Sequence, residues 1–428
     1  MRAAGFCVRR AVQSTARAIR LPLTAVAFAL LVAFPVAPAR ADPAFKAFLE
    51  TVWPEAKAAG VSRATFDRAF LGVEPDLNLP DLVLAGRSQN NSKGQAEFTR
   101  PPQDYVARDQ LIRLADQGRA LRTKHATTLV EVERQVGVDG PVVLGIWGRE
   151  TAYGAHRSTH YEVRVLATQA YTGRRQEMFR AELIAALRLL EDRTLTVETM
   201  RSSWAGAMGL TQFMPTEFYQ SGHDLDGDGK IDLFNSVPDA LGSAAKQLKQ
   251  KGWIKGLAWG FEVRPGATVD CANEGPANQR PIADWMKQGV TRADGQPFPR
   301  ERLGQTAYLM SPGGTFGPQF LVTDNFKVLR AYNTSDLYAL FVGHLSDRIA
   351  GGGDFRTPWA QIKQLAPKDI EEAQRRLKER GYAMDKIDGK IGSNTRWQIG
   401  LYQRQAGLPV DCWPTERLLT SLRRVAVQ

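Results

Sequence analysis

The chain has 428 residues, of which 43% are hydrophobic and 24% are charged, a composition that excludes wholesale disorder and a polytopic membrane protein. The formal net charge is +11, yet six of the 56 basic residues are arginines within residues 1–41, which contain no acidic residue. The remaining 50 basic and 45 acidic residues form no dense basic run, which argues against a nucleic-acid-binding protein.

Residues 1–41 have the three parts of a secretion signal. An arginine-rich start precedes the apolar run at residues 21–36, and Ala-Arg-Ala at residues 39–41 forms a cleavage pattern. The run contains two prolines and is short for a bilayer span. We therefore expect cleavage before Asp42, a periplasmic protein and no stable membrane anchor, with Sec and Tat export both open.

Helical periodicity dominates residues 42–195. In QEMFRAELIAALRLLED, apolar residues three and four apart line one face of the expected helix: Phe179, Leu183, Leu187 and Leu190. Residues 259–324 contain short strand-like runs broken by Gly and Pro, which predict a small β-rich insertion. Helical periodicity returns at residues 326–349 and ends at the glycines 351–353 and Pro358. The first large domain is therefore expected at residues 42–358.

A linker at residues 359–365 and a small helical domain at residues 366–428 are expected to complete the chain. This last segment contains two helical patterns around the turn IDGKIG. One interpretation makes it a tether for the large domain, and the other makes it structural support. Cys271 and Cys412, which are 141 residues apart, could form a disulfide or remain two buried thiols.

One carboxylate, Glu150, ends an apolar stretch in the motif GIWGRETAYG. A carboxyl group in apolar surroundings tends to have a raised pKa, as a general acid near neutral pH requires. Taken alone the motif is weak evidence, because a glutamate at a helix end is usually a solvated surface group or a cap.

Two further motifs contain residue types that suit sugar binding. In SWAGAMGLTQFMP, small residues allow close approach of the backbone, and Gln212 offers an amide to sugar hydroxyl and N-acetyl groups. In NFKVLRAYNTSDLYAL, Tyr332, Asn333 and Tyr338 combine rings with polar tips. Each motif alone is better explained by core packing.

The segment HDLDGDGKIDLFNSVPDA has the spacing of an EF-hand-like calcium loop. Asn235 stands at position 12, where a standard loop has Glu, so the closing carboxylate could come from Asp239 and the affinity should be modest. The other interpretation is an Asp-rich turn without metal. The residues expected to provide oxygen ligands are Asp224, Asp226, Asp228, Lys230 through its carbonyl, and Asp239.

Taken in order, the motifs resemble the lytic murein transglycosylase B family of lysozyme-like enzymes that cleave peptidoglycan. GRETAYG, RRQEMFRAEL, SWAGAMGLTQFMP, DGDGKIDLFNSVPDA, WGFEV and YNTSDLYA occur in family order, and that order is far more specific than any one motif. AQRRLKERGY, DGKIG and NTRWQIGLYQRQAGL resemble a peptidoglycan-binding domain. The resemblance implies an α+β, mainly α fold: a lysozyme-like catalytic domain with a small β insertion, then a small helical-bundle domain.

The resemblance also implies roles for individual residues. Glu150 stands where the family has its single catalytic acid, and the Asp-rich loop matches the family's calcium site. Arg149 departs from the family pattern, but adjacent helical residues point about 100° apart, so the two need not pair. Residues that match substrate-binding positions are Arg174, Arg175, Ser203, Gln212, Phe213, Tyr332, Asn333 and Tyr338.

The implied reaction is cleavage of the β-1,4 bond between N-acetylmuramic acid and N-acetylglucosamine, which leaves 1,6-anhydromuramic ends. A hydrolytic muramidase would need a second carboxylate, for which Glu177 and Glu162 are candidates. A non-catalytic peptidoglycan-binding protein would not need the Glu150 motif. We expect a monomer that binds peptidoglycan strands and structural Ca²⁺, with no organic cofactor and no nucleic acid. Cell-wall protein partners and exolytic or endolytic preference stay open.

Overall fold

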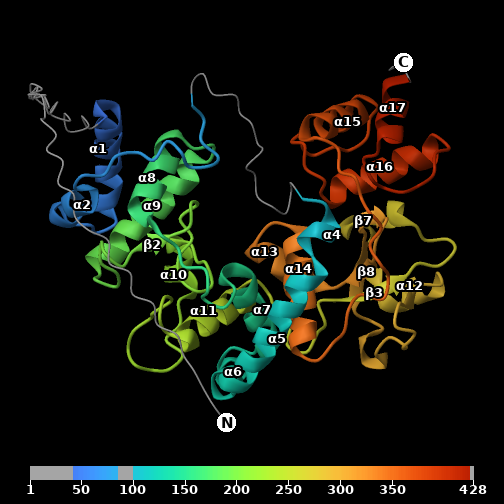
Figure 1. Cartoon of the computed structure of the whole chain (residues 1–428), viewed down its shortest axis with the longest axis horizontal. Coiled ribbons are helices and arrows are strands. Elements are labelled where there is room, and N and C mark those ends of the chain that lie inside the picture. Colours follow the sequence, from blue (N-terminus) through green and yellow to red (C-terminus); the bar gives the residue numbers. More distant parts are fainter. Residues whose placement is uncertain (1–41, 85–99, 425–428) are drawn as a thin grey trace, which may run out of the picture. The chain divides into compact units, whose positions relative to one another are not determined.

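A computed structural model describes residues 42–84 and 100–424 (Figure 1). The expected secretion signal at residues 1–41 lies outside the described residues. Among those residues, no helix combines the length and apolar character that a membrane crossing requires. The helices are α1 (Pro43–Ala58), α2 (Arg63–Phe70), α4 (Pro102–Tyr105), α5 (Arg108–Lys124), α6 (Ala126–Gln135), α7 (Gly140–Thr151), α8 (Glu162–Thr172), α9 (Gln176–Glu191), α10 (Pro215–Ser221), α11 (Val237–Gln250), α12 (Ile282–Lys287), α13 (Asp324–Tyr332), α14 (Asp336–Ile349), α15 (Pro367–Glu379), α16 (Ser393–Gln405) and α17 (Glu416–Arg424).

The strands form two antiparallel sheets. The small one pairs β1 (His160–Tyr161) with β2 (Arg201–Ser202), and the larger has the order β4-β6-β8-β3-β5. Its elements lie within the stretch expected to be β-rich: β3 (Gly260–Arg264), β4 (Arg280–Pro281), β5 (Thr291–Arg292), β6 (Thr306–Met310) and β8 (Gln319–Val322), with β7 (Pro312–Thr315) between the last two. The expected fold class, mainly helical with a small β insertion, is confirmed.

Helices α7 and α14 pack closely in the main hydrophobic core. Two glycines of α7 leave room for this contact. A Cβ atom at Gly145 would lie 3.0 Å from the carbonyl oxygen of Val342 on α14, and one at Gly148 would lie 2.7 Å from the ring of Tyr153. The two helices therefore approach to a distance that larger residues would prevent.

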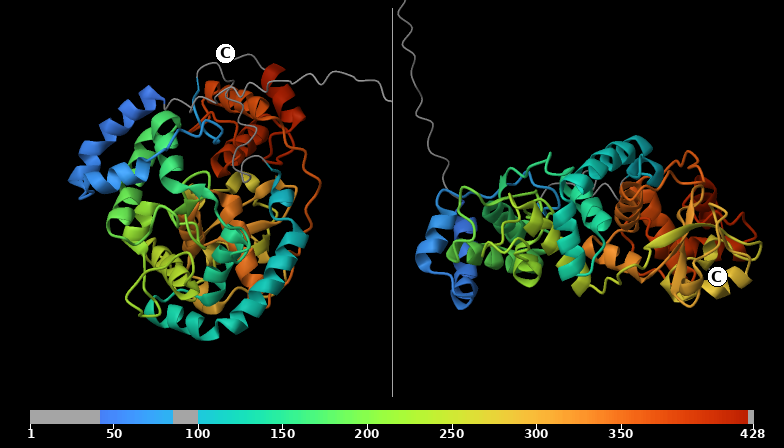
Figure 2. Two further views of the ribbon diagram at one scale, coloured as in Figure 1. Left: turned by 60° about the vertical axis from the view of Figure 1, so that its left-hand side comes forward. Right: turned by 90° about the horizontal axis from the view of Figure 1, so that it is seen from below.

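A second core lies among α1, α2, α8, α9 and α10. The predicted apolar face of α9 is buried in it, which confirms the helical pattern read from Phe179 to Leu190. In the right-hand view of Figure 2, these blue and green helices lie to one side and the yellow and orange sheet to the other, with the teal segment that contains α7 between them.

The C-terminal helices α15 to α17 have their own small core and also pack on the β insertion (Figure 1). Cys271 and Cys412 form a disulfide, which resolves the open choice between a bridge and two thiols. Cys412 adopts a φ of 55°, a left-handed conformation that glycine usually takes. The amide of Thr315 on β7 donates to the carbonyl oxygen of Asp411 at 3.1 Å.

A buried ion cluster adds to this contact. Arg396 on α16 is only 2% exposed and pairs with Glu274 and Asp336, both of which belong to residues 42–358. The expected linker also packs, because the amide of Ala360 donates to Phe316 and the carbonyl of Ile362 accepts from Gln103. These contacts favour structural support over a free tether, while the domain bounds themselves stay a prediction.

Replacing both Cys271 and Cys412 by Ser should lower the free energy of unfolding by about 2–5 kcal/mol, because the bridge closes a long loop. The measurement is urea denaturation of the variant and of the wild-type protein. Reductant should lower the wild-type stability toward that of the variant and leave the variant unchanged. Equal stabilities under oxidising conditions would contradict the expected contribution of the bridge.

Candidate active site

Glu150 is the penultimate residue of α7, and the backbone turns sharply after it. Ala152, Tyr153 and Gly154 all have positive φ, at 47°, 59° and 84°. Tyr153 is buried and its hydroxyl donates to the carbonyl of Leu114 at 2.8 Å, which holds this turn in place. The half-buried Glu150 is thus presented at the end of a rigid helix, as the apolar motif predicted.

Two stacked tyrosines lie beside Glu150. The hydroxyl of Tyr338 donates to Glu150 Oε1 at 2.5 Å, and the ring of Tyr332 stacks on Tyr338 with 6.2 Å between centroids and 7° between planes. The Tyr332 hydroxyl donates to the carbonyl of Thr211 at 2.7 Å. Burial raises the pKa of both tyrosines well above its usual range, and the Glu150 carboxylate raises it further. Both hydroxyls therefore stay neutral donors.

Arg149, the neighbour of Glu150 on α7, contacts two aromatic rings. Its guanidinium lies 4.5 Å from the ring centre of Tyr105 and 4.8 Å from that of Phe341, and it donates to the Tyr105 hydroxyl. A guanidinium over aromatic faces is a favourable cation–π arrangement, so these rings hold the Arg149 side chain.

The glycine-rich loop after β2 carries Ser203, Gln212 and Phe213. Ser203 Oγ accepts from two amides of its own turn, at Ala205 and Ala207. Gln212 has a φ of 55°, and its Nε2 atom donates to the carbonyl of Gly209 at 3.0 Å. Phe213 is buried, and its ring makes an edge contact with the ring of Tyr332, so it packs against the tyrosine stack.

Three more residues were expected to bind substrate: Arg174, Arg175 and Asn333. Arg174 and Arg175 are exposed in the turn between α8 and α9, and both pair with Asp81, at 3.2 and 3.6 Å. Asn333 follows the last residue of α13 and lies between the two tyrosines in sequence. The structure thus brings Glu150, Tyr332, Tyr338 and Phe213 together, and it places the arginine pair on a separate turn.

A cavity of about 960 Å³ has Thr151, the residue that follows Glu150, in its wall, while Glu150 itself is not among its lining residues. Thr151 Oγ1 donates to the carbonyl of Leu210 at 2.8 Å and so joins the end of α7 to the glycine-rich loop. Two arginines of the cavity wall, Arg157 and Arg193, were not predicted from the sequence, because neither lies in a recognisable motif. Other lining residues include Ser158, Asp192, Arg201, Gly209, Leu210 and Asn235.

The two candidates for a second carboxylate lie in contrasting environments. Glu162 is completely buried, and neither of its carboxylate oxygens has a hydrogen-bond partner among the described residues. Burial raises its pKa well above the usual range, and the nearby Glu182 raises it further, so Glu162 stays neutral. Glu177 is exposed in the first turn of α9.

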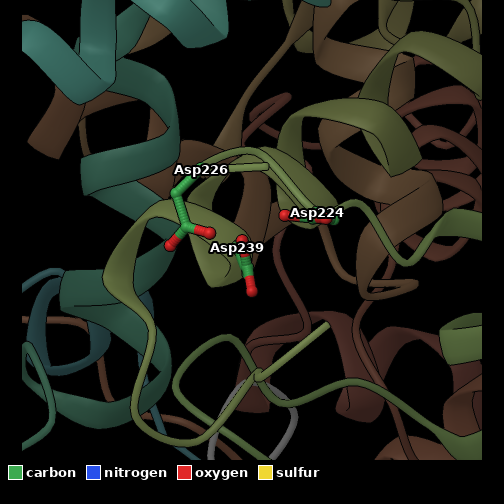
Figure 3. Close-up of side chains that lie close together, drawn as sticks. All are labelled: Asp224, Asp226 and Asp239. Atoms are coloured by element: carbon green, nitrogen blue, oxygen red, sulfur yellow. The ribbon is translucent and has the colours of Figure 1, made fainter. Parts of the chain in front are cut away.

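The Asp-rich loop brings three carboxylates together (Figure 3). Asp224, Asp226 and Asp239 each offer an oxygen within 4.8 Å of the others. Asp239 is buried at the start of α11, and burial raises its pKa. Asp228 lies outside this cluster and accepts from the amide of Lys230 at 2.9 Å. Asp239, the residue that could provide the closing carboxylate in place of Glu at position 12, is one of the three.

Two family models match the chain. Residues 44–347 match a model described as "Transglycosylase SLT domain", and residues 367–422 match one for a peptidoglycan binding domain. Membrane-bound lytic murein transglycosylase B of Escherichia coli (strain K12) is 32% identical over 218 residues, which is 50% of this chain. The match spans 58% of that relative's length.

Solved structures show the same fold. SltB3 from Pseudomonas aeruginosa, in complex with NAG-anhNAM-pentapeptide, has a TM-score of 0.80 and 40% identity over 89% of this chain and 100% of its own. The Escherichia coli lytic transglycosylase SLT35, in complex with calcium, has a TM-score of 0.57 and 24% identity over 72% of this chain and 93% of its own. The second likeness shows the fold alone.

Replacing the buried Glu162 by Gln should stabilise the protein increasingly as the pH rises from 5 to 8. Because the pKa of Glu162 is raised in the folded state, the folded protein keeps this proton at pH values where the unfolded chain has lost it. The contribution of Glu162 to the free energy of unfolding is therefore complete at low pH and is lost as the pH rises. The gain should approach about 1.4 kcal/mol per pH unit above the pKa of the unfolded state. The exposed Glu177→Gln is the matched control. Melting temperatures that differ from wild type equally at both pH values would contradict the burial of a neutral Glu162.

Proposed function

The chain belongs to the transglycosylase SLT domain family, and on this basis we propose that it is a lytic transglycosylase acting on peptidoglycan. Its reaction is cleavage of the β-1,4 bond between N-acetylmuramic acid and N-acetylglucosamine. The observation that carries this proposal is the half-buried Glu150, held by the neutral Tyr338 hydroxyl at the end of α7. A general acid that is fixed by a hydrogen bond and partly shielded from water suits this chemistry.

One carboxyl group can serve both steps of the reaction. Glu150, as the acid, gives its proton to the glycosidic oxygen, and the bond from C1 of the muramic residue to that oxygen breaks. Glu150, now a carboxylate, takes the proton of the C6 hydroxyl, and O6 bonds to C1. The product is a 1,6-anhydromuramic end, no water is consumed, and Glu150 regains its proton. Tyr338 keeps the carboxyl group oriented through both steps.

The surroundings of Glu150 support a glycan as the substrate. The Tyr332–Tyr338 stack lies beside Glu150, and the loop that joins the end of α7 through Thr151 contains Gln212. The cavity beyond Thr151 has room for further sugar or peptide groups, and its Arg157 and Arg193 suit the carboxylates of peptidoglycan peptides. Ser203, Phe213, Asn333 and the pair Arg174–Arg175 complete the proposed binding residues.

An export route to the periplasm is part of the proposal. The leader pattern at residues 1–41 and the Cys271–Cys412 disulfide both suit an oxidising compartment outside the cytoplasm. The peptidoglycan-binding domain family of residues 367–422 suits an enzyme that works on the wall, in agreement with the cell-wall relatives.

Calcium is the metal that the Asp-rich loop fits. Its donors are carboxylate oxygens, which hard cations prefer, and a buried Asp239 closes the cluster from α11. Asp224, Asp226 and Asp239 would hold the ion, with Asp228 and the Lys230 carbonyl as additional ligands. The ion would stabilise the loop, which forms part of the cavity wall through Asp224, Gly229 and Lys230.

Replacing Glu150 by Gln should lower the turnover of purified glycan strands by more than about 10⁴-fold, because one group acts as both acid and base. Binding to intact peptidoglycan should persist. The measurement is mass spectrometry of the released fragments, in which the wild-type protein gives anhydromuramic ends.

Glu177→Gln is the matched control and should behave as wild type. Reducing ends in place of anhydro ends would identify a hydrolase, and wild-type turnover by Glu150→Gln would overturn the proposed role of this residue.

Calcium should raise the melting temperature, because a ligand that binds only the folded state adds about 2.7 kcal/mol at one hundred times its dissociation constant. The shift should disappear in Asp226→Asn and persist in Asp284→Asn, which removes an exposed carboxylate outside the loop. The measurement is thermal denaturation with calcium and with a chelator. An equal shift in both variants would show that the ion binds elsewhere.

A further inference from the structure

We propose that Arg396 of the C-terminal helix α16 is a positioning residue for the Glu150–Tyr338 pair, and that it acts through Asp336. This inference rests on the proposed function, because its readout is glycan cleavage. In this proposal the C-terminal segment helps to fix the position of Tyr338 beside Glu150, in addition to any binding of peptidoglycan.

The contact begins with a guanidinium group that is enclosed on all sides. Arg396 Nε lies 3.1 and 3.2 Å from the two carboxylate oxygens of Glu274, and Nη2 donates to Asp336 Oδ2 at 3.0 Å. The side chains of Arg396, Glu274 and Asp336 are 2%, 0% and 7% exposed. Water therefore cannot replace either partner, and the geometry of the cluster is tightly specified.

Asp336 is held from its other side as well. Its Oδ1 atom lies 2.8 Å from Nε of Arg330 on α13. One carboxylate thus joins two arginines, and these come from segments 66 residues apart in the chain. Because both of its oxygens are engaged, Asp336 cannot move without disturbing one of the two ion pairs.

Asp336 is also the first residue of α14, the helix that carries Tyr338. The preceding Ser335 caps this helix and accepts from the amide of Tyr338 at 3.3 Å. Tyr338, two residues after Asp336, reaches Glu150 with its hydroxyl. Arg330, in turn, stands two residues before Tyr332 on α13. Each stacked tyrosine therefore lies two residues from a charged member of the cluster.

Loss of the Arg396 contact should shift the first turn of α14 and with it the Tyr338 hydroxyl. A displacement of about 1 Å can cost about 100-fold in rate when reacting groups must be aligned. The overall fold of the large domain need not change, since α7 and α14 keep their contact in the core.

The test replaces Arg396 by Met together with Glu274 by Gln, so that no buried charge of this pair is left alone. On soluble glycan fragments, kcat should fall by about 10- to 100-fold while KM changes by less than about twofold. The alkaline limb of the pH–rate profile should move to higher pH, because the Tyr338 hydrogen bond stabilises the carboxylate form of Glu150. Arg396→Lys should restore part of kcat.

Two control variants test whether the loss of any contact between the C-terminal segment and the large domain has the same effect as the loss of Arg396. Arg404→Gln removes an ion pair of the same helix, to Asp270 at 2.7 Å, and this pair is half-exposed and distant in sequence from α14. The double variant Cys271→Ser with Cys412→Ser removes the disulfide of the same contact. Both controls should retain wild-type kcat and the wild-type pH profile.

The outcomes are distinct. Wild-type kcat in the Arg396→Met/Glu274→Gln variant would overturn the proposal, and so would an equal loss in the two controls. If this variant fails to fold, Asp336→Asn provides the same test from the other side of the contact, and unchanged kcat there would overturn the proposal. Absence of cleavage by the wild-type protein would instead overturn the proposed function.

Discussion

The close packing of α7 against α14 is the constraint on which the site depends. Glu150 stands at the end of α7 and Tyr338 at the start of α14, so these residues meet only if the two helices run side by side. Gly145 and Gly148 allow that approach, since a Cβ atom at these positions would lie 3.0 Å from the carbonyl oxygen of Val342 and 3.1 Å from Cδ2 of Leu345, both on α14. The glycines of the motif thus have a packing role, and the glutamate at its end has the chemical one.

Local sequence patterns predicted the parts of this structure that depend on local physics. The spacing of apolar residues from Phe179 to Leu190 is set by the helical period, and the strand-like runs between 259 and 324 are set by alternation and turns. The end of α7 near Glu150 follows from its apolar run and the residues after it. None of these features requires knowledge of distant contacts.

The partners of the site residues could not be read in the same way. Glu150 and Tyr338 are 188 residues apart, and Arg396 is 60 residues from Asp336. Spacing alone also left the pairing of Cys271 and Cys412 open, because a disulfide needs two chain segments to be brought together by the fold. Asp228 shows the same limit, since it fits the loop spacing but lies outside the three-carboxylate cluster.

The C-terminal segment illustrates how a contact changes an interpretation. A free tether raises the effective concentration of an enzyme near its polymer and leaves the chemistry unchanged. The disulfide, the packed residues at 359–362 and the buried Arg396 instead hold this segment against the β insertion. The segment therefore has a fixed relation to the β insertion, which a free tether would not have.

Stability alone is a weak explanation for the buried ion cluster. Burial of Arg396, Glu274 and Asp336 costs solvation energy, and apolar residues of similar size often stabilise a protein equally well or better. An arginine with directional partners nevertheless fixes one arrangement, whereas apolar side chains tolerate several. Glu162 provides the contrast, because it is buried with no hydrogen-bond partner in the described part of the chain, and burial raises its pKa well above the usual range. The paired cluster therefore fits a demand for geometry at the start of α14, where Tyr338 must meet Glu150.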